Sequence, residues 1–202
     1  MSFFFKKNIN LKNNSLIVDD FSSYNYEILQ DKINHLKKNF NINGLILSIT
    51  SNSFDFLIGY VHFFESMKPQ MLLDKQTSVE SINKIINRFK PKYLFLPKNL
   101  KKNFNYQIIF ELNSYIFFKT NFNDIKINKK IAFLMPTSGS TGDQKFAKIS
   151  FDNIYDNTKN IIKYLKLSLN DCTITTLQPS YSYGMSILNT HLLTKSSIIL
   201  TE

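Results

Sequence analysis

The stretch PTSGSTGDQKFAKIS, residues 136–150, brings two glycines, a run of hydroxyl side chains and a lysine into one short segment. The whole chain of 202 residues has only 5 glycines, so finding two of them three residues apart indicates a specialised loop. Glycine lets backbone come close to a ligand, and converging N–H groups, hydroxyls and a lysine suit phosphate oxygens. A polar surface turn is the simpler interpretation of the same composition.

The sequence on either side of this loop favours a phosphate site. Residues 131–135 are a short apolar run that predicts a buried strand. After the loop, Ile154, Ile161 and Leu165 recur at helical spacing, and Ser150 stands where a helix N-cap is expected. A strand, a glycine loop and a helix follow one another in phosphate-binding turns, although here the helix begins some distance after the second glycine.

Comparison with known phosphate-binding motifs indicates which type of loop this is. The Walker A pattern has a glycine directly before its lysine and a Ser or Thr directly after it. Gln144 and Phe146 occupy those two positions, which argues against a P-loop NTPase. The segment instead resembles the phosphate-binding signature of the adenylate-forming enzymes, the AMP-dependent synthetases and ligases. The matching residues are Leu134, Thr137, Ser138, Gly139, Ser140, Thr141, Gly142 and Lys145. Gln144 departs from the signature, as does Phe151 where a His is common.

A second segment, LQPSYSYGMSILNTHLL at residues 177–193, resembles the next core motif of the same enzymes. Tyr181 stands where many members carry His, and Tyr183 and Gly184 match an aromatic-glycine pair. The resemblance implies that this segment borders the pocket for the acid and its adenylate. Two tyrosines two residues apart are expected to share one side of an extended loop, with Gly184 allowing close approach of a ligand. The alternative is that both tyrosines are packed aromatics.

The resemblance implies an activity. A carboxylic acid would be activated by ATP as an acyl-adenylate and passed to a thiol of CoA or of a phosphopantetheinyl carrier protein. The loop from Thr137 to Lys145 would hold the ATP phosphates, and Tyr181, Tyr183 and Gly184 would line the substrate pocket. Mg²⁺ is expected with ATP, but its ligands, like the catalytic lysine, belong to parts of these enzymes that we do not find in this chain. A non-catalytic nucleotide-binding or interaction fragment is the alternative function.

Residues 1–202 resemble only the N-terminal portion of an AMP-binding domain. We expect the remainder of the large domain and the C-terminal lid domain to be absent, so whether the chain acts as an enzyme alone is open. A second polypeptide carrying the rest of the enzyme is a possible partner. A sheet without its later strands should leave an unpaired edge and apolar surface exposed near residues 198–200.

The periodicity along the chain predicts an α/β fold, in which sheet strands alternate with covering helices. This agrees with a partial large N-terminal domain of the adenylate-forming fold. Helices are expected around residues 29–40, 54–64, 79–89 and 151–165, and strands around residues 44–50, 70–73, 93–97, 108–112, 115–118 and 131–135.

Composition limits the other classes of function. The formal net charge of +10 comes from lysine pairs scattered along the chain, so nucleic-acid binding is a minority interpretation. No apolar run approaches the roughly 18 to 20 residues of a membrane span, and the start MSFFFKKN is unlike a secretory signal. We therefore expect a cytoplasmic protein.

Cysteine and histidine usage indicates no redox or metal chemistry. Cys172 is the single cysteine, which excludes an internal disulfide, and we expect it to be a small buried residue. His35, His62 and His191 show no metal-binding spacing, and a structural role is expected for each.

Overall fold

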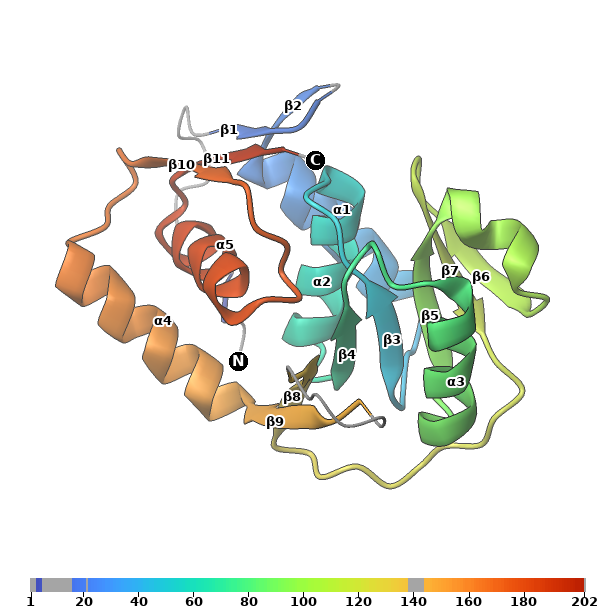
Figure 1. Ribbon diagram of the computed structural model, residues 1–202. Helices are drawn as coiled ribbons and strands as arrows, with labels where there is room; N and C mark the ends of the chain where they lie inside the picture. Colours follow the sequence, from blue (N-terminus) through green and yellow to red (C-terminus); the bar gives the residue numbers. More distant parts are fainter. Residues whose placement is uncertain (1–2, 5–15, 21, 138–143, 202) are drawn as a thin grey trace.

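The computed structural model describes residues 3–4, 16–20, 22–137 and 144–201. In this part of the chain the strands form two sheets and the helices lie against them (Figure 1). The strands are β1 (Leu16–Val18), β2 (Ser23–Asn25), β3 (Ile46–Ile49), β4 (Gln70–Leu73), β5 (Tyr93–Pro97), β6 (Gln107–Glu111), β7 (Tyr115–Lys119), β8 (Ile131–Pro136), β9 (Phe146–Ser150), β10 (Cys172–Thr175) and β11 (Ser197–Leu200). The helices are α1 (Tyr26–Asn39), α2 (Phe54–Glu65), α3 (Val79–Phe89), α4 (Phe151–Leu165) and α5 (Ser182–Thr194), with a 3-10 turn η1 (Lys98–Asn103).

The larger sheet has seven strands in the order β6-β7-β5-β3-β4-β8-β9. Strands β5, β3, β4 and β8 are parallel to one another. Strand β7 pairs antiparallel with both β5 and β6, and β9 pairs antiparallel with β8. Its central strands are covered on both faces. In β4, Met71 and Leu73 enter the core beside α3, whereas Leu72 enters the core on the opposite face. Burial on both faces explains why these strands are continuous apolar runs.

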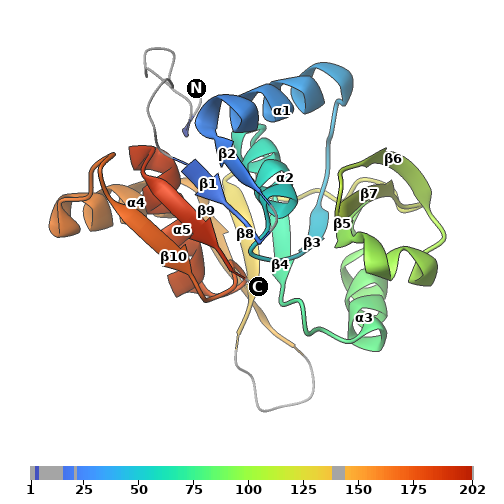
Figure 2. The same cartoon turned by 90° about the horizontal axis from the view of Figure 1, so that it is seen from above.

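The helices are divided between the two faces of the large sheet. Figures 1 and 2 both place α3 and the β6-β7 pair on one side of the molecule and α4, α5 and the smaller sheet on the other. Helices α1, α2, α4 and α5 contribute to one core with both sheets. Helix α2 packs closely on the large sheet, because a Cβ at Gly59 would lie 2.3 Å from the ring of Phe95. Asn25, Ser53, Ser78 and Ser150 cap α1 to α4 through their side chains.

The smaller sheet has the order β10-β11-β1-β2 and corrects one expectation. Strand β11 pairs in parallel with β10 on one side and with β1 on the other. Ile198 and Leu200 face the core and are only 0% and 3% exposed. The prediction of an unpaired edge near residues 198–200 is wrong, because residues 16–18 supply a neighbouring strand. The edges of this sheet are β10 and β2.

The α/β prediction is confirmed, and each expected helix and strand has a counterpart. The sequence did not indicate β1, β2, β9 or β10. Cys172 is exposed, so the expectation that it is buried is wrong. Within the described ranges, no helix is both long and apolar enough to cross a membrane.

Candidate functional site

The glycine-rich stretch connects the two strands of a hairpin. Strand β8 ends at Pro136 and β9 begins at Phe146, with those two residues in register. The Thr137 N–H donates to the Lys145 carbonyl at 2.9 Å, and the Thr137 hydroxyl contacts the same oxygen at 3.3 Å. The base of the loop is thus closed by its two outer residues. The intervening predicted site residues, Ser138, Gly139, Ser140, Thr141 and Gly142, lie outside the described residues.

Strand β9 separates the loop from the helix that follows it. Ser150 caps α4 as predicted: its hydroxyl oxygen accepts from the Asn153 N–H at 3.0 Å, and the Ser150 N–H donates to the Asn153 amide oxygen at 3.3 Å. This reciprocal pair satisfies the first turn of α4 from within the chain. The order is therefore strand, loop, strand and helix, and an anion in the loop would be bound without help from the α4 N-terminus.

The second motif lies at the same end of the large sheet as the hairpin loop. Ser180 donates from its hydroxyl to a carboxylate oxygen of Asp74 at 3.4 Å. Asp74 directly follows β4, the neighbour of β8 in the sheet, and Thr137 directly follows β8. In Figure 1 the segment between β10 and α5 reaches toward the end of β4. Carboxyl ends of parallel strands are where α/β sheets bind ligands.

The two tyrosines of this motif do not share an extended loop. Tyr181 is the N-cap residue of α5, and Tyr183 lies in the first turn of the helix. Both rings face solvent, with 56% and 66% of their surface exposed, so neither is a packed core aromatic. A Cβ at Gly184 would lie 2.6 Å from the Leu177 carbonyl oxygen and 2.5 Å from that of Gln178. Gly184 therefore admits the chain's own backbone.

Helix α5 also begins differently from the other helices. Its N-cap residue makes no side-chain hydrogen bond to the first turn, in contrast to the caps of α1 to α4. The first N–H groups of a helix need partners, and together they carry partial positive charge. The start of α5 is thus a polar end beside two exposed tyrosines.

A buried amide that the sequence did not single out joins the two sheets at this end. Asn52 follows β3 and is 3% exposed. Its side-chain N–H groups donate to the carbonyls of Thr175 at 3.0 Å and Thr201 at 2.9 Å. Thr175 is the last residue of β10, and Thr201 directly follows β11. The carboxyl ends of the parallel strands of both sheets therefore meet at Asn52. Its partners are 123 and 149 residues away in sequence, so no local pattern marks it.

A cavity of about 580 Å³ lies farther along the same end of the large sheet. Ile49 at the end of β3, Pro97 at the end of β5 and Tyr115 at the start of β7 contribute to its lining. Asp19 and Asp55 add carboxylates, and the Asp55 carboxylate accepts from the hydroxyl of Ser114 at 2.9 Å. Among the described residues of the two motifs, none of the predicted site residues lines this cavity.

The structure gives no metal centre to the described residues. No group of three or more His, Cys, Asp or Glu side chains among them is placed to hold an ion. His62 is 1% exposed inside α2, and burial lowers its pKa to about 4. His191 contacts the Ile187 carbonyl at 2.9 Å through its Nδ1 atom, which is a helix-internal contact.

The described residues share their α/β fold with part of several solved adenylate-forming ligases. No protein-family model matches the sequence, and a search of curated proteins found no match. The likeness is to solved structures, all at low sequence identity, and it concerns the fold.

Three solved structures illustrate this likeness. The apo form of MatB from Rhodopseudomonas palustris has a TM-score of 0.76 at 16% identity, over 96% of this chain and 43% of MatB. VinN has a TM-score of 0.68 at 14% identity, over 93% of this chain and 55% of VinN. MenE, the O-succinylbenzoate Coenzyme A synthetase from Bacillus subtilis in complex with AMP, has a TM-score of 0.69 at 14% identity, over 92% and 52%. The chain thus spans about half the length of these proteins.

Proposed function

We propose that the β8-β9 loop binds the phosphates of ATP and that the chain takes part in activating a carboxylic acid as an acyl-adenylate. The observation that carries this proposal is the loop itself: its glycines, hydroxyls and Lys145 match the adenylate-forming signature, and its base is closed by Thr137 and Lys145 at the carboxyl end of β8. An ATP-bound form of MatB has the same fold over 94% of this chain, with a TM-score of 0.68.

The division of roles follows the position of each residue. Residues 137–145 would hold the β- and γ-phosphates and stabilise the leaving pyrophosphate through backbone N–H groups and the Lys145 ammonium. Tyr181 and Tyr183 would lie beside the acid, and the uncapped start of α5 would face a carboxylate or phosphate oxygen. The acyl group would then pass to a thiol of CoA or a carrier protein. We assign no step to Mg²⁺, because the described residues offer it no set of ligands.

We further propose that residues 1–202 correspond to the N-terminal portion of an AMP-binding domain. The matched share of MatB, VinN and MenE, 43%, 55% and 52%, supports this. In those proteins the other half of the chain completes the molecule, so catalysis of the whole reaction is proposed for this portion together with the corresponding remainder. A second polypeptide is one source of that remainder.

Calorimetric titration with ATP and with pyrophosphate tests the phosphate site. Lys145→Ala should weaken binding by about tenfold or more, since a charge-assisted hydrogen bond contributes about 1.5 to 3 kcal/mol. The Lys145 side chain is exposed, so the melting temperature should stay the same. Lys163→Ala, an exposed lysine on α4, is the matched control. Equal affinity of wild type and Lys145→Ala for ATP and pyrophosphate would contradict the proposal that this loop binds the phosphates.

Exchange of labelled pyrophosphate into ATP, measured over a panel of carboxylic acids, separates catalysis from binding. Exchange that depends on an acid is expected when the chain is supplied with the missing portion of a related enzyme. ATP binding without acid-dependent exchange would instead support the alternative, a non-catalytic nucleotide-binding fragment.

A further inference from the structure

A groove on the α3 side of the large sheet combines an apolar lining with charged walls. It lies between the C-terminal end of α3, residues 125–128 and the β8-β9 hairpin, and encloses about 560 Å³. Leu45 and Leu134 lie beneath it and are only 1% and 7% exposed, so the apolar surface open to a ligand comes from partly exposed lining residues such as Ile125 and Ile127. The rings of Phe89 and Phe146, with centroids 5.0 Å apart, form part of the wall.

The described residues that line the groove carry charge of one sign only. No Asp or Glu is among the described residues that line it. Arg88 is held in place at the wall, because its Nη1 donates to the Gln144 carbonyl at 3.0 Å. Within the described part of the chain, no carboxylate forms an ion pair with any of the basic lining residues. These exposed basic residues are Arg88, Lys126, Lys145 and Lys148.

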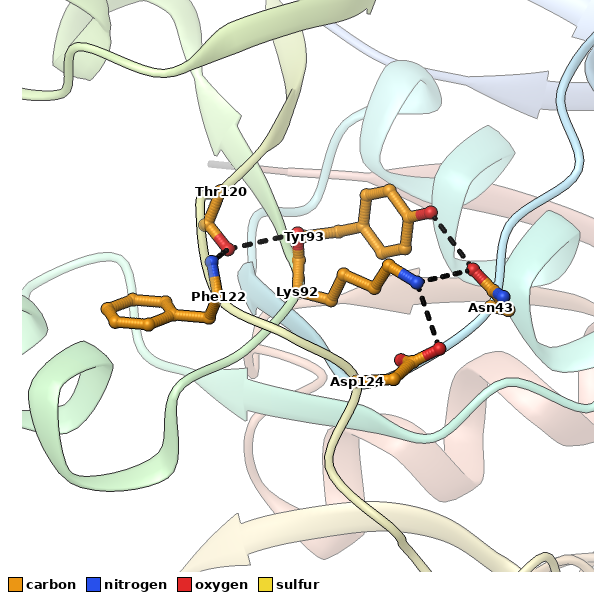
Figure 3. Close-up of polar contacts among 6 residues, drawn as sticks. All are labelled: Asn43, Lys92, Tyr93, Thr120, Phe122 and Asp124. Atoms are coloured by element: carbon orange, nitrogen blue, oxygen red, sulfur yellow. Dashed lines mark hydrogen bonds and ion pairs between the residues drawn. The ribbon is translucent and has the colours of Figure 1, made fainter.

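The segment from β7 to β8 that supplies one wall is fixed at its start. The Thr120 hydroxyl donates to the Pro91 carbonyl at 2.7 Å. Farther along, the Lys92 amine contacts Asp124 at 2.9 Å and donates to the side-chain oxygen of Asn43 at 2.8 Å. Figure 3 shows this amine between the two side chains, one on the segment and one before β3. Two of these contacts hold the first half of the segment, and the hydrogen bond to Asn43 positions the Lys92 amine.

The other end of the same segment is also fixed. The N–H of Ile131 donates to the Asn128 carbonyl at 3.0 Å, and the N–H of Lys130 donates to the Asn128 side chain at 3.0 Å. Residues 125–128 therefore span a short distance between two anchored points. A wall that is ordered before binding lowers the entropy cost of taking up a ligand.

We propose that this groove binds a free single-chain carboxylate, with the hydrocarbon chain against the apolar side chains of Phe89, Ile127 and Phe146 and the carboxylate against Lys126 and Lys148. An apolar, concave site with a few polar groups is typical of small-molecule binding, and the cations select an anion. A flat membrane surface would contact the charged walls of the groove but not the apolar lining between them. A nucleic-acid backbone would leave the apolar lining unused. The site is proposed as separate from the adenylation chemistry, and of the described loop residues it shares Lys145 with the phosphate loop.

Calorimetry with dodecanoate below its micelle concentration is the direct test, using the whole chain. One molecule per chain should bind. Dodecanol should bind at least about tenfold more weakly because it lacks the charge, and acetate should not bind because it lacks the chain. Added salt should weaken dodecanoate binding by screening the exposed cations. Dodecyltrimethylammonium should not bind.

Variants locate the site without touching Lys145. Lys148→Glu and Lys126→Glu should each weaken dodecanoate about tenfold, whereas Lys32→Glu on the exposed face of α1 should leave it unchanged. Ile127→Ser should weaken dodecanol and dodecanoate alike, because it removes apolar wall rather than charge. Melting curves show whether each variant is folded. If Ile127→Ser does not fold, the lysine variants still test the proposal, because the lysines that they replace are exposed.

Three outcomes would overturn the proposal. The first is dodecanoate affinity that is the same in Lys148→Glu, Lys126→Glu and wild type. The second is binding to phosphatidylserine vesicles with no binding of monomeric dodecanoate, which would indicate a membrane surface. The third is displacement of dodecanoate by ATP together with weaker ATP binding in Lys148→Glu, which would make the groove part of the nucleotide site. Failure of the ATP experiments alone would leave this proposal untouched.

Discussion

Raising the pH from 7 to 10 should stabilise the folded chain, because the amine of Lys195 is buried. Lys195 is 2% exposed, and its amine donates to the carbonyls of Phe4 at 2.7 Å and Leu192 at 3.0 Å. It also lies 4.9 Å from the centre of the Tyr26 ring. Burial lowers the pKa of this amine from 10.5 to about 7, against the attraction of the Glu65 carboxylate.

The direction of the effect follows from proton uptake. Between pH 7 and pH 10.5 the unfolded chain carries a proton on Lys195 that the folded chain has lost. The free energy of unfolding therefore rises with pH across this window. Below pH 7 the folded chain also carries the proton, so the full cost of burying the charge lowers its stability. At about 1.4 kcal/mol per pKa unit, the free energy of unfolding should increase by about 3 to 4 kcal/mol between pH 7 and 10. Above pH 10 the gain should reverse, because burial raises the pKa values of Tyr26 and Tyr60.

Urea unfolding at several pH values from 7 to 10 measures this gain. Lys195→Met cannot titrate, so its stability relative to wild type should fall by about 3 to 4 kcal/mol over the range. Lys166→Met is the matched control, since Lys166 also ends a helix in the left-handed conformation, at φ 55° against 60° for Lys195, but is exposed. Curves of wild type and Lys195→Met that run parallel from pH 7 to 10 would refute the reasoning.

Three further predictions concern stability. Gly44→Ala should lower the free energy of unfolding by roughly 1 to 3 kcal/mol in urea titrations, because Gly44 has φ +109° and an added Cβ would lie 2.2 Å from the Asp124 carboxylate; an unchanged midpoint would contradict this. Ser150→Ala should lower it by about 1 kcal/mol through loss of the α4 cap, and Ser150→Gly by only a few tenths. Acidification from pH 6.5 to 4 should lower the free energy of unfolding by up to about 3 kcal/mol through His62. Burial lowers the pKa of His62 from 6.5 to about 4, so the unfolded chain takes up the proton first. His62→Phe should lose that part of the dependence on pH, as thermal melting at pH 7 and 4.5 would measure.

The elements predicted well from the sequence are those buried on one or both faces. Strand β4 was expected at residues 70–73 and lies there, because a strand covered on both faces is mostly apolar, here from Met71 to Leu73. Helix α3 follows the stripe through Ile82 and Ile86, which the structure buries at 0% and 2% exposure. Strands β1, β2 and β10 gave no such signal. They have three or four residues each, and part of each faces solvent.

The candidate site was predicted less completely, for two physical reasons. Motifs report local chemistry, so they marked the loop and Tyr181, but Asn52 and Asp74 act through partners more than one hundred residues away. The spacing of Tyr181 and Tyr183 suggested an extended loop, yet α5 begins at Ser182 and turns the two rings onto a helix start. The phosphate loop between Thr137 and Lys145 remains a prediction from its residues.

The prediction of an unpaired edge at residues 198–200 was wrong for a physical reason. The same reason explains where the apolar surface of this sheet is exposed. The sequence order suggested that β11 would be the last strand of a single sheet, but parallel pairing with β1 joins residues about 180 positions apart. The two faces of the smaller sheet then differ. Ile198 and Leu200 face the core, while Ile174 and Ile199, paired across β10 and β11, are 54% and 37% exposed. Apolar exposure in this sheet thus lies on its outer face and not along the backbone of β11, whose hydrogen-bonding sides are both occupied.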